Sequence, residues 1–153
     1  RLRGYRSALE AHGIPYDPAI VVEAEYSVES GYAAAGRLLS AVEPPTAVFA
    51  SSANLTIGLM RWLSDHGIAC PDDLSVVCID DFPMAGAVVP RLTAVAQPIQ
   101  EMGRRAIARL IERLTLPKTG EVARHTFQPT LIVRESCAPL RRRPPKRRAE
   151  KAE

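Results

Sequence analysis

Two adjacent carboxylates end the stretch SVVCIDDFP, residues 75–83, where Asp80 and Asp81 follow a run of apolar and β-branched residues. Paired carboxylates can act as a general acid and base or hold a metal ion, and both uses require that they converge on one atom. Adjacent residues of a strand point to opposite faces, so these two are not expected to converge. We therefore interpret Asp80 as a ligand-binding carboxylate that accepts hydrogen bonds from vicinal hydroxyls, and Asp81 as a turn or capping residue.

Other polar side chains also stand at the ends of apolar runs. Ser51 and Ser52 follow TAVFA, and Gln97 ends the run LTAVAQ. In a parallel α/β sheet, ligands bind where the carboxyl ends of the strands meet. A set made of Asp80, Ser52 and Gln97, with Tyr26 supplying an aromatic face, suits a neutral polyhydroxylated ligand such as a sugar.

Several other kinds of chemistry have no support in the sequence. There is no GxGxxG, GxxxxGK[ST] or GxSxG motif, and the three cysteines and three histidines are dispersed without metal-ligand spacing. The sequence therefore indicates neither a metal site nor a cofactor. Dispersed thiols fit a reducing compartment, and no apolar run approaches the ~20 residues that span a bilayer. An enzyme on an open α/β sheet remains an alternative that rests on the fold class alone.

The elements that must position these side chains alternate along the chain. The spacing of apolar residues predicts helices over 1–13, 27–42, 54–67 and 99–116, the second capped by Ser27. Short apolar runs predict strands over 46–51, 75–80 and 92–98, the first two buried on both faces. Residues 20–26 are expected to be extended, and residues 124–136 to form a strand pair around a Pro break. This alternation predicts an α/β domain with a parallel sheet flanked by helices.

Each predicted helix has an apolar face that we expect to point inward. The faces of the last three are Tyr32, Leu38, Leu39 and Val42; Leu55, Leu59, Trp62 and Leu63; and Ile99, Met102, Ala106, Leu110 and Leu114. The segment GYAAAG, residues 31–36, is interpreted as a place of close helix packing rather than as a phosphate-binding loop.

The positive charge of the chain is concentrated at one end. The 153 residues carry a formal charge of +3, but residues 141–153 hold seven Lys and Arg against two Glu, so the remainder carries −2. The folded part is therefore not expected to be a nucleic-acid surface. Residues 140–153 are expected to form a disordered basic tail beyond a domain over 1–139.

Five stretches together resemble one protein family. They are RLRGYRSAL, SGYAAAGRLL, PPTAVFASSANLTIGLMRWLSDHGI, PDDLSVVCIDDFPMAGAVVPRLTAVAQPIQEMGRRA and LIVRES. In their order they resemble the C-terminal part of the LacI/GalR family of bacterial transcriptional regulators. The resemblance implies a type I periplasmic-binding-protein-like fold with Rossmann-like lobes, of which these residues hold mostly the C-terminal lobe. It also implies that the helix over 99–116 belongs to the other lobe.

The resemblance also implies which residues hold a small-molecule effector, which in the family is usually a carbohydrate or a nucleoside-like molecule. Arg1 stands at the position of an arginine that clamps the effector, and Tyr26 at that of an aromatic that stacks on it. Ser52 stands where the family often has Asn, and offers only a hydroxyl. Asp80 matches the first Asp of the family's GxDD motif, and Gln97 matches the glutamine at the crossover between lobes.

The function expected from the resemblance is regulatory rather than catalytic. Effector binding would alter operator affinity through an N-terminal helix-turn-helix that these residues do not include. The resemblance further implies a cytoplasmic homodimer, with the stretch LTIGLMRWL pairing between copies or simply packing in the core. The alternative is a solute-binding receptor of an ABC transporter, which has the same fold and a similar cleft.

Overall fold

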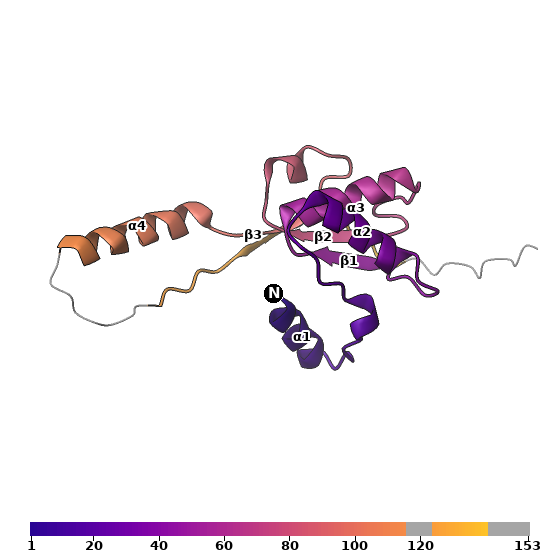
Figure 1. The fold of residues 1–153 in the computed structure, drawn as a ribbon, viewed down its shortest axis with the longest axis horizontal. Helices are drawn as coiled ribbons and strands as arrows, with labels where there is room; N and C mark the ends of the chain where they lie inside the picture. The colour runs from indigo at the N-terminus through magenta and orange to yellow at the C-terminus, as the bar shows by residue number, and fades with distance from the viewer. Residues whose placement is uncertain (116–123, 141–153) are drawn as a thin grey trace, which may run out of the picture.

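A computed structural model describes residues 1–115 and 124–140 of the chain (Figure 1). Its central feature is a four-stranded sheet in the order β1-β2-β3-β4, in which β1, β2 and β3 are parallel and β4 is antiparallel to β3. The strands are Ala47–Ala50, Ser75–Ile79, Thr93–Ala96 and Thr130–Ile132. The α-helices α1 to α4 are Leu2–Ala11, Val28–Leu39, Ala53–Asp65 and Ile99–Thr115, and two short 3-10 helices are Pro18–Ile20 and Pro83–Gly86. The predicted α/β class, with a mainly parallel sheet flanked by helices, is confirmed.

Helices α2 and α3 begin at serine caps and pack closely against each other. The Ser27 hydroxyl accepts a hydrogen bond from the Ser30 backbone, as predicted. A Cβ added to Gly31 would lie 2.6 Å from the carbonyl oxygen of Leu55, and one added to Gly58 would lie 2.1 Å from that of Val28. Only glycine allows the two backbones to approach so closely, so the prediction that residues 31–36 mark close helix packing is confirmed.

The core lies between this helix pair and one face of the sheet. Its first cluster contains Ala35, Ala50, Leu59, Trp62, Leu63, Leu74 and Val76, and its second contains Cys78, Ala85, Leu92 and Ala94. Three of the four predicted inner residues of α3, Leu59, Trp62 and Leu63, therefore pack in the core, whereas Leu55 is half-buried and lines a cavity. The stretch LTIGLMRWL contributes Leu59 and Trp62 to that core, so this buried stripe is not available for pairing between copies.

The prediction that the first two strands are buried on both faces is wrong. Phe49 is 43% exposed, and Ala47 is exposed as well. In β2, buried Val76 and Cys78 alternate with half-buried neighbours. The reason is that α2 and α3 cover one face only (Figure 1), whereas a cavity separates α1 from the other face at β1.

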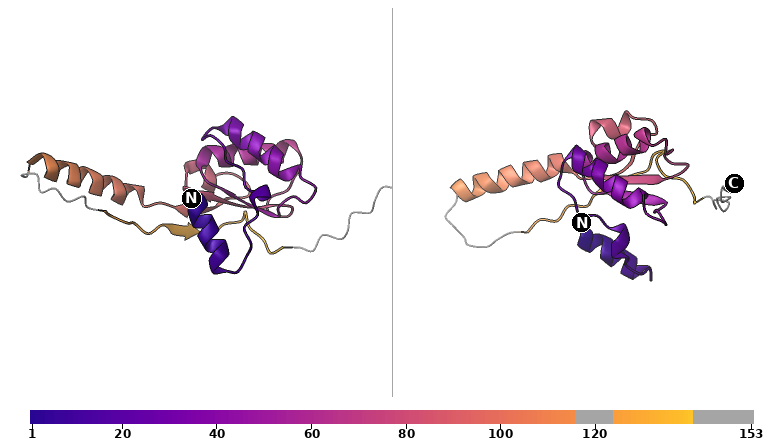
Figure 2. Two further views of the ribbon diagram at one scale, coloured as in Figure 1. Left: turned by 60° about the horizontal axis from the view of Figure 1, so that its bottom comes forward. Right: turned by 45° about the vertical axis from the view of Figure 1, so that its right-hand side comes forward.

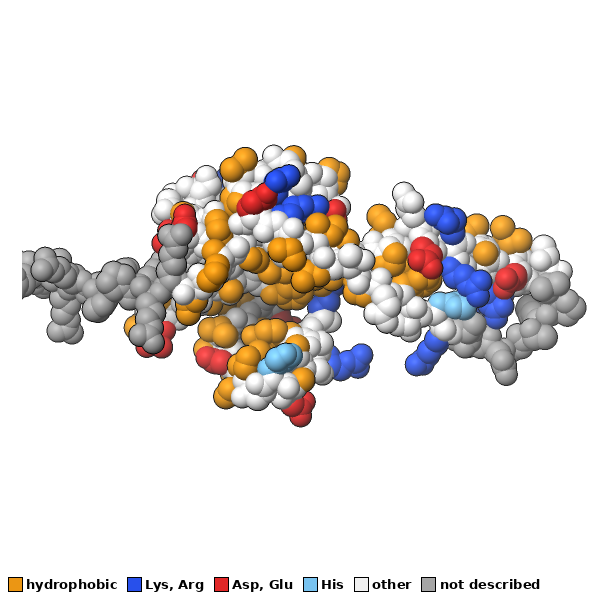
Figure 3. Space-filling model, turned by 180° about the vertical axis from the view of Figure 1, so that it is seen from behind, with side chains coloured by type: hydrophobic (Ala, Val, Ile, Leu, Met, Phe, Trp, Pro, Cys, Tyr) orange, Lys and Arg blue, Asp and Glu red, His pale blue; other side chains and the backbone are white. Residues whose placement is uncertain are grey.

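Helix α4 also departs from its predicted environment. It projects away from the sheet as an arm, and this is visible from two further directions (Figure 2). None of its residues is buried, so the prediction of an inward face is wrong for this helix. Space-filling spheres show hydrophobic and charged side chains together on the arm (Figure 3). Its apolar stripe has no covering element among the described residues.

Four smaller expectations also need correction or refinement, or fall outside the description. Residues 124–136 contain the single strand β4 rather than a strand pair, because Pro129 has no N–H to donate to a ladder. Val42 is fully exposed, because α2 ends at Leu39. Of the segment expected to be extended, Ile20 belongs to the 3-10 helix and Val21 is extended, and residues 21–25 have no regular secondary structure. The predicted basic tail lies outside the described residues from residue 141 onward.

Candidate functional site

The carboxyl ends of the three parallel strands meet at one edge of the sheet. The register pairs Ala50 with Cys78 and Ile79 with Val95, so the residues that follow each strand emerge side by side. The predicted site residues Ser52, Asp80 and Gln97 therefore all lie at the edge where an open α/β sheet binds ligands.

Asp80 is held in an unusual backbone conformation at this edge. Its φ is 73°, and it is the only non-glycine residue with positive φ among residues 1–115 and 124–140. Its backbone N–H donates to the carbonyl oxygen of Val95 at 3.0 Å. Gln97 Nε2 donates to Asp80 Oδ1 at 2.5 Å, which fixes the carboxylate and leaves Oδ2 as the oxygen that Gln97 does not engage. A strained residue fixed in this way at a strand end is typical of functional sites.

Arg1 and Tyr26 lie apart from this pair, at a cavity of about 790 Å³ between α1, residues 20–26 and β1. Arg1 donates to the carbonyl oxygen of Ser51, directly after β1. Tyr26 is 66% exposed, and its carbonyl oxygen accepts a hydrogen bond from Asn54 Nδ2 at 3.0 Å. This bond ties the Tyr26 loop to the first turn of α3.

The cavity is mainly apolar, and the carboxylate pair does not line it. Its walls are formed by α1, the 20–26 segment and the outward face of β1, including Phe49, with Arg1, Glu23 and Tyr26 as polar groups. Asp80, Gln97 and Ser52 are not among its lining residues. The structure thus brings two pairs of the predicted residues together along the same edge, Asp80 with Gln97 and Arg1 with Tyr26, rather than all five as one shell.

Ser52 has a local task that the sequence pattern did not identify. Its hydroxyl accepts a hydrogen bond from the Leu55 backbone N–H at 3.3 Å, which caps α3. Its carbonyl oxygen accepts from the Thr56 hydroxyl at 2.7 Å. A ligand would therefore meet a hydroxyl that already serves the helix, and its lone pairs leave room for one further hydrogen bond.

Asp81 has a different partner from Asp80, as expected for adjacent strand-end residues. Its Oδ1 lies 2.7 Å from Arg134 Nη1, and the guanidinium lowers the pKa of the Asp81 carboxyl below its usual value. Arg134 also donates to the carbonyl oxygen of Leu92 at 2.9 Å. Asp81 therefore fastens the segment after β4 to the sheet edge. Sequence reasoning missed Arg134, although its place in the stretch LIVRES was a possible signal.

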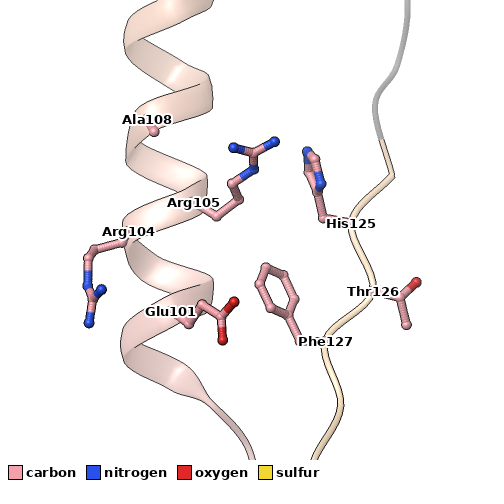
Figure 4. A pocket seen from close by; sticks show the side chains of 7 residues that line it. All are labelled: Glu101, Arg104, Arg105, Ala108, His125, Thr126 and Phe127. Carbon is pink, nitrogen blue, oxygen red and sulfur yellow. The ribbon is translucent and has the colours of Figure 1, made fainter.

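A second hollow lies on the arm, between α4 and residues 125–127. Arg105, His125 and Phe127 point toward one another across it, whereas Arg104 and Thr126 point away (Figure 4). Glu101 also faces this hollow, so cationic and anionic groups meet there. None of the predicted site residues lines it.

Two features are absent from residues 1–115 and 124–140. No group of three or more His, Cys, Asp and Glu in these ranges is arranged to hold a metal ion. No helix in the described part of the chain has the length and apolar character to cross a membrane.

Comparison with known proteins places this fold in a family. Residues 1–137 match the family model described as a periplasmic binding protein-like domain. The HTH-type transcriptional regulator DegA of Bacillus subtilis is 37% identical over 140 residues, which are 92% of this chain and 41% of that protein. CelR of Thermobifida fusca is 38% identical over 136 residues, covering 89% of this chain and 40% of that protein. The chain thus spans about two fifths of the length of these relatives.

Solved structures agree with the sequence relatives. A LacI family transcriptional regulator from Enterococcus faecium with bound ribose superposes with a TM-score of 0.82 at 33% identity, covering 92% of this chain and 51% of that one. A complex of the regulator CelR with cellobiose gives a TM-score of 0.82 at 38% identity, covering 88% of this chain and 41% of that one. The chain therefore belongs to the periplasmic binding protein-like domain family, as part of the domain that LacI-family transcriptional regulators carry.

Proposed function

We propose that this chain is the effector-binding part of a LacI-type transcriptional regulator and that its effector is a carbohydrate. The observation that carries the proposal is the Asp80–Gln97 pair at the carboxyl edge of the sheet, held by a 2.5 Å hydrogen bond. A fixed carboxylate oxygen accepts hydrogen bonds from two neighbouring hydroxyls of a sugar. The related structures with bound ribose and cellobiose support this choice of ligand class.

The remaining predicted residues complete the proposed contact with the sugar. Tyr26 is exposed beside the edge and offers an aromatic face on which a sugar ring can stack. The Arg1 guanidinium, directed to the Ser51 carbonyl in this structure, offers donors to the ligand hydroxyls. The apolar stripe of α4 would be covered by a second lobe, which would close over the ligand from the other side.

The proposed activity is a shift of equilibrium rather than a chemical reaction. The effector would bind one arrangement of the two lobes more tightly than the other and so change operator affinity. Operator DNA, a homodimeric partner and a cytoplasmic location belong to this proposal, because DegA and CelR are named as transcriptional regulators. A solute-binding receptor of an ABC transporter would share the fold, but neither of these relatives bears such a name.

The test measures sugar binding and its effect on DNA binding in the intact protein. Isothermal titration with a panel of pentoses, hexoses and disaccharides should find a ligand, and Asp80→Asn should weaken it at least about tenfold through loss of charge-assisted hydrogen bonds. Asp65→Asn, at an exposed carboxylate on α3, is the matched control and should leave the affinity unchanged. The proposal is wrong if Asp80→Asn folds normally and binds every sugar as the wild type does, or if bound sugar leaves operator affinity unchanged.

A further inference from the structure

Two of the three free cysteines lie at one junction between β2 and the segment after β4. The Val76 N–H donates to the Ser136 carbonyl oxygen at 2.8 Å, and the Ser136 hydroxyl donates to the Val76 carbonyl oxygen at 2.6 Å. Cys70 Sγ lies 3.5 Å from the Ser136 carbonyl oxygen, and Cys137 Sγ lies 3.5 Å from the Val76 carbonyl oxygen. Both thiols therefore contact the same pair of hydrogen-bonded residues.

The distances place the two side chains within reach of each other. The Ser136 carbonyl oxygen and the Cys137 Cα belong to one planar trans peptide and are about 3 Å apart. Because Cys70 Sγ is 3.5 Å from that oxygen, it is at most about 6 Å from the Cys137 Cα. Cys137 Sγ is about 3 Å from its own Cα, so the two sulfurs are at most about 9 Å apart, and rotation of this exposed side chain can shorten that distance.

The two thiols differ in exposure, and this difference decides which of them an oxidant reaches first. Cys137 is exposed, so a dissolved oxidant meets it first, whereas Cys70 is half-buried in the loop between α3 and β2. Burial and then the neighbouring charge of Cys137 raise the pKa of the Cys70 thiol to about 11, which makes it a poor first nucleophile. Cys78 lies in the core with no exposed surface and provides an internal reference.

We propose that Cys137 and Cys70 form a peroxide-responsive thiol pair that closes to a disulfide. The Cys137 thiolate attacks one oxygen of a hydroperoxide, the O–O bond breaks, and a sulfenic acid and water (or an alcohol) are formed. The Cys70 sulfur then attacks the sulfenic sulfur, the S–S bond forms, and the hydroxyl leaves as water with the proton from Cys70. Two thiols lose two electrons, and the peroxide takes them up.

The disulfide would fasten the C-terminal segment to the lobe. It would link Cys70, in the loop before β2, to Cys137, in the segment after β4. Disulfides in a reducing compartment are characteristically transient and redox-sensing. The pair thus adds a reversible covalent tie at the base of the lobe, independent of any ligand at the Asp80 edge.

The test is differential alkylation of the intact protein after treatment with hydrogen peroxide, followed by mass spectrometry. A protease that cleaves before aspartate separates Cys70 from Cys78. Free thiol at both Cys70 and Cys137 should fall about tenfold, a linked peptide should appear, and dithiothreitol should reverse both changes. Cys78 should remain reduced.

Two variants make the result decisive. In Cys137→Ser, an exposed change, Cys70 should keep its free thiol under the same peroxide dose. In Cys70→Ser, Cys137 should proceed to sulfinic acid or to disulfides between copies. The proposal is overturned if Cys70 remains free in the wild type while Cys137 is oxidised, or if Cys70 is oxidised equally in Cys137→Ser.

Discussion

Substitution of Gly58 by alanine tests the argument that two backbones in direct contact hold this lobe together. The added Cβ would lie 2.1 Å from the Val28 carbonyl oxygen, 2.5 Å from the Tyr32 nitrogen and 2.8 Å from the Gly31 carbonyl carbon. Ordinary contact begins near 3.4 Å, so the first distance is 1.3 Å too short. All three atoms belong to the backbone, so no side chain can rotate away, and α2 and α3 must move apart.

The expected cost follows from two opposing terms. Overpacking costs about 1–3 kcal/mol, and contacts with three backbone atoms argue for the upper end of that range or beyond it. The higher helix propensity of alanine returns about 1 kcal/mol. We therefore expect Gly58→Ala to lower the free energy of unfolding by about 2 kcal/mol, which is a lowering of the melting temperature by about 4–8 °C for a domain of this size.

Urea unfolding followed by circular dichroism measures this change as a lower midpoint at unchanged slope. The matched control is Gly4→Ala in α1, where an added Cβ would meet nothing within 4 Å. That variant should be neutral or more stable by up to about 1 kcal/mol, because only the propensity term acts. If Gly58→Ala were as stable as Gly4→Ala, the close approach of α2 and α3 would be refuted.

Two further predictions concern the junction between the sheet and the C-terminal segment. Ser136→Ala should lower the free energy of unfolding in urea by about 1–3 kcal/mol, because two backbone groups would lose the fully buried hydroxyl as their partner. The control Ser64→Ala, at an exposed position, should change this free energy little. Equal losses in the two variants would contradict the prediction. Asp81→Asn should lower the free energy of unfolding at neutral pH, because Arg134 lowers the pKa of the Asp81 carboxyl in the folded state. The ion pair therefore stabilises the protein above the ordinary pKa of 3.8, and this stabilisation is lost as the pH falls through the pKa of the folded state. The gap in urea midpoint between wild type and Asp81→Asn should therefore close below about pH 4, and a gap constant with pH would contradict the ion pair.

Local signals in the sequence predicted the elements well because they act over a few residues. Ser27 caps α2 as its position before an apolar-periodic run indicated. The parallel strands were found from short β-branched runs, and three of them are present. Asp80 and Gln97 were placed at the ends of different strands, and their meeting followed from the rule that parallel strands share a carboxyl edge.

What the sequence could not settle depends on elements that lie far apart in the chain. The apolar stripe of α4 has the spacing of a buried helix face, but nothing among the described residues covers it. Phe49 similarly faces a cavity rather than a packed layer. The pairing of Asp81 with Arg134 joins residues 53 positions apart, and no local pattern distinguishes such a partner from a solvated arginine.

Two charges can end an apolar strand here because each of them has a partner from another segment. Asp80 takes its hydrogen bond from Gln97, the second residue before α4, and Asp81 takes its ion pair from Arg134, which follows β4. The chain leaves the sheet for α4 just after Gln97, and it has returned to the sheet through β4 just before Arg134. Under the proposed function, a sugar hydroxyl at Asp80 would act on the same carboxylate that holds the outgoing crossover. Under that proposal, ligand contact and lobe connection would share one strand end, so that a difference in effector affinity between two lobe arrangements would arise at this carboxylate.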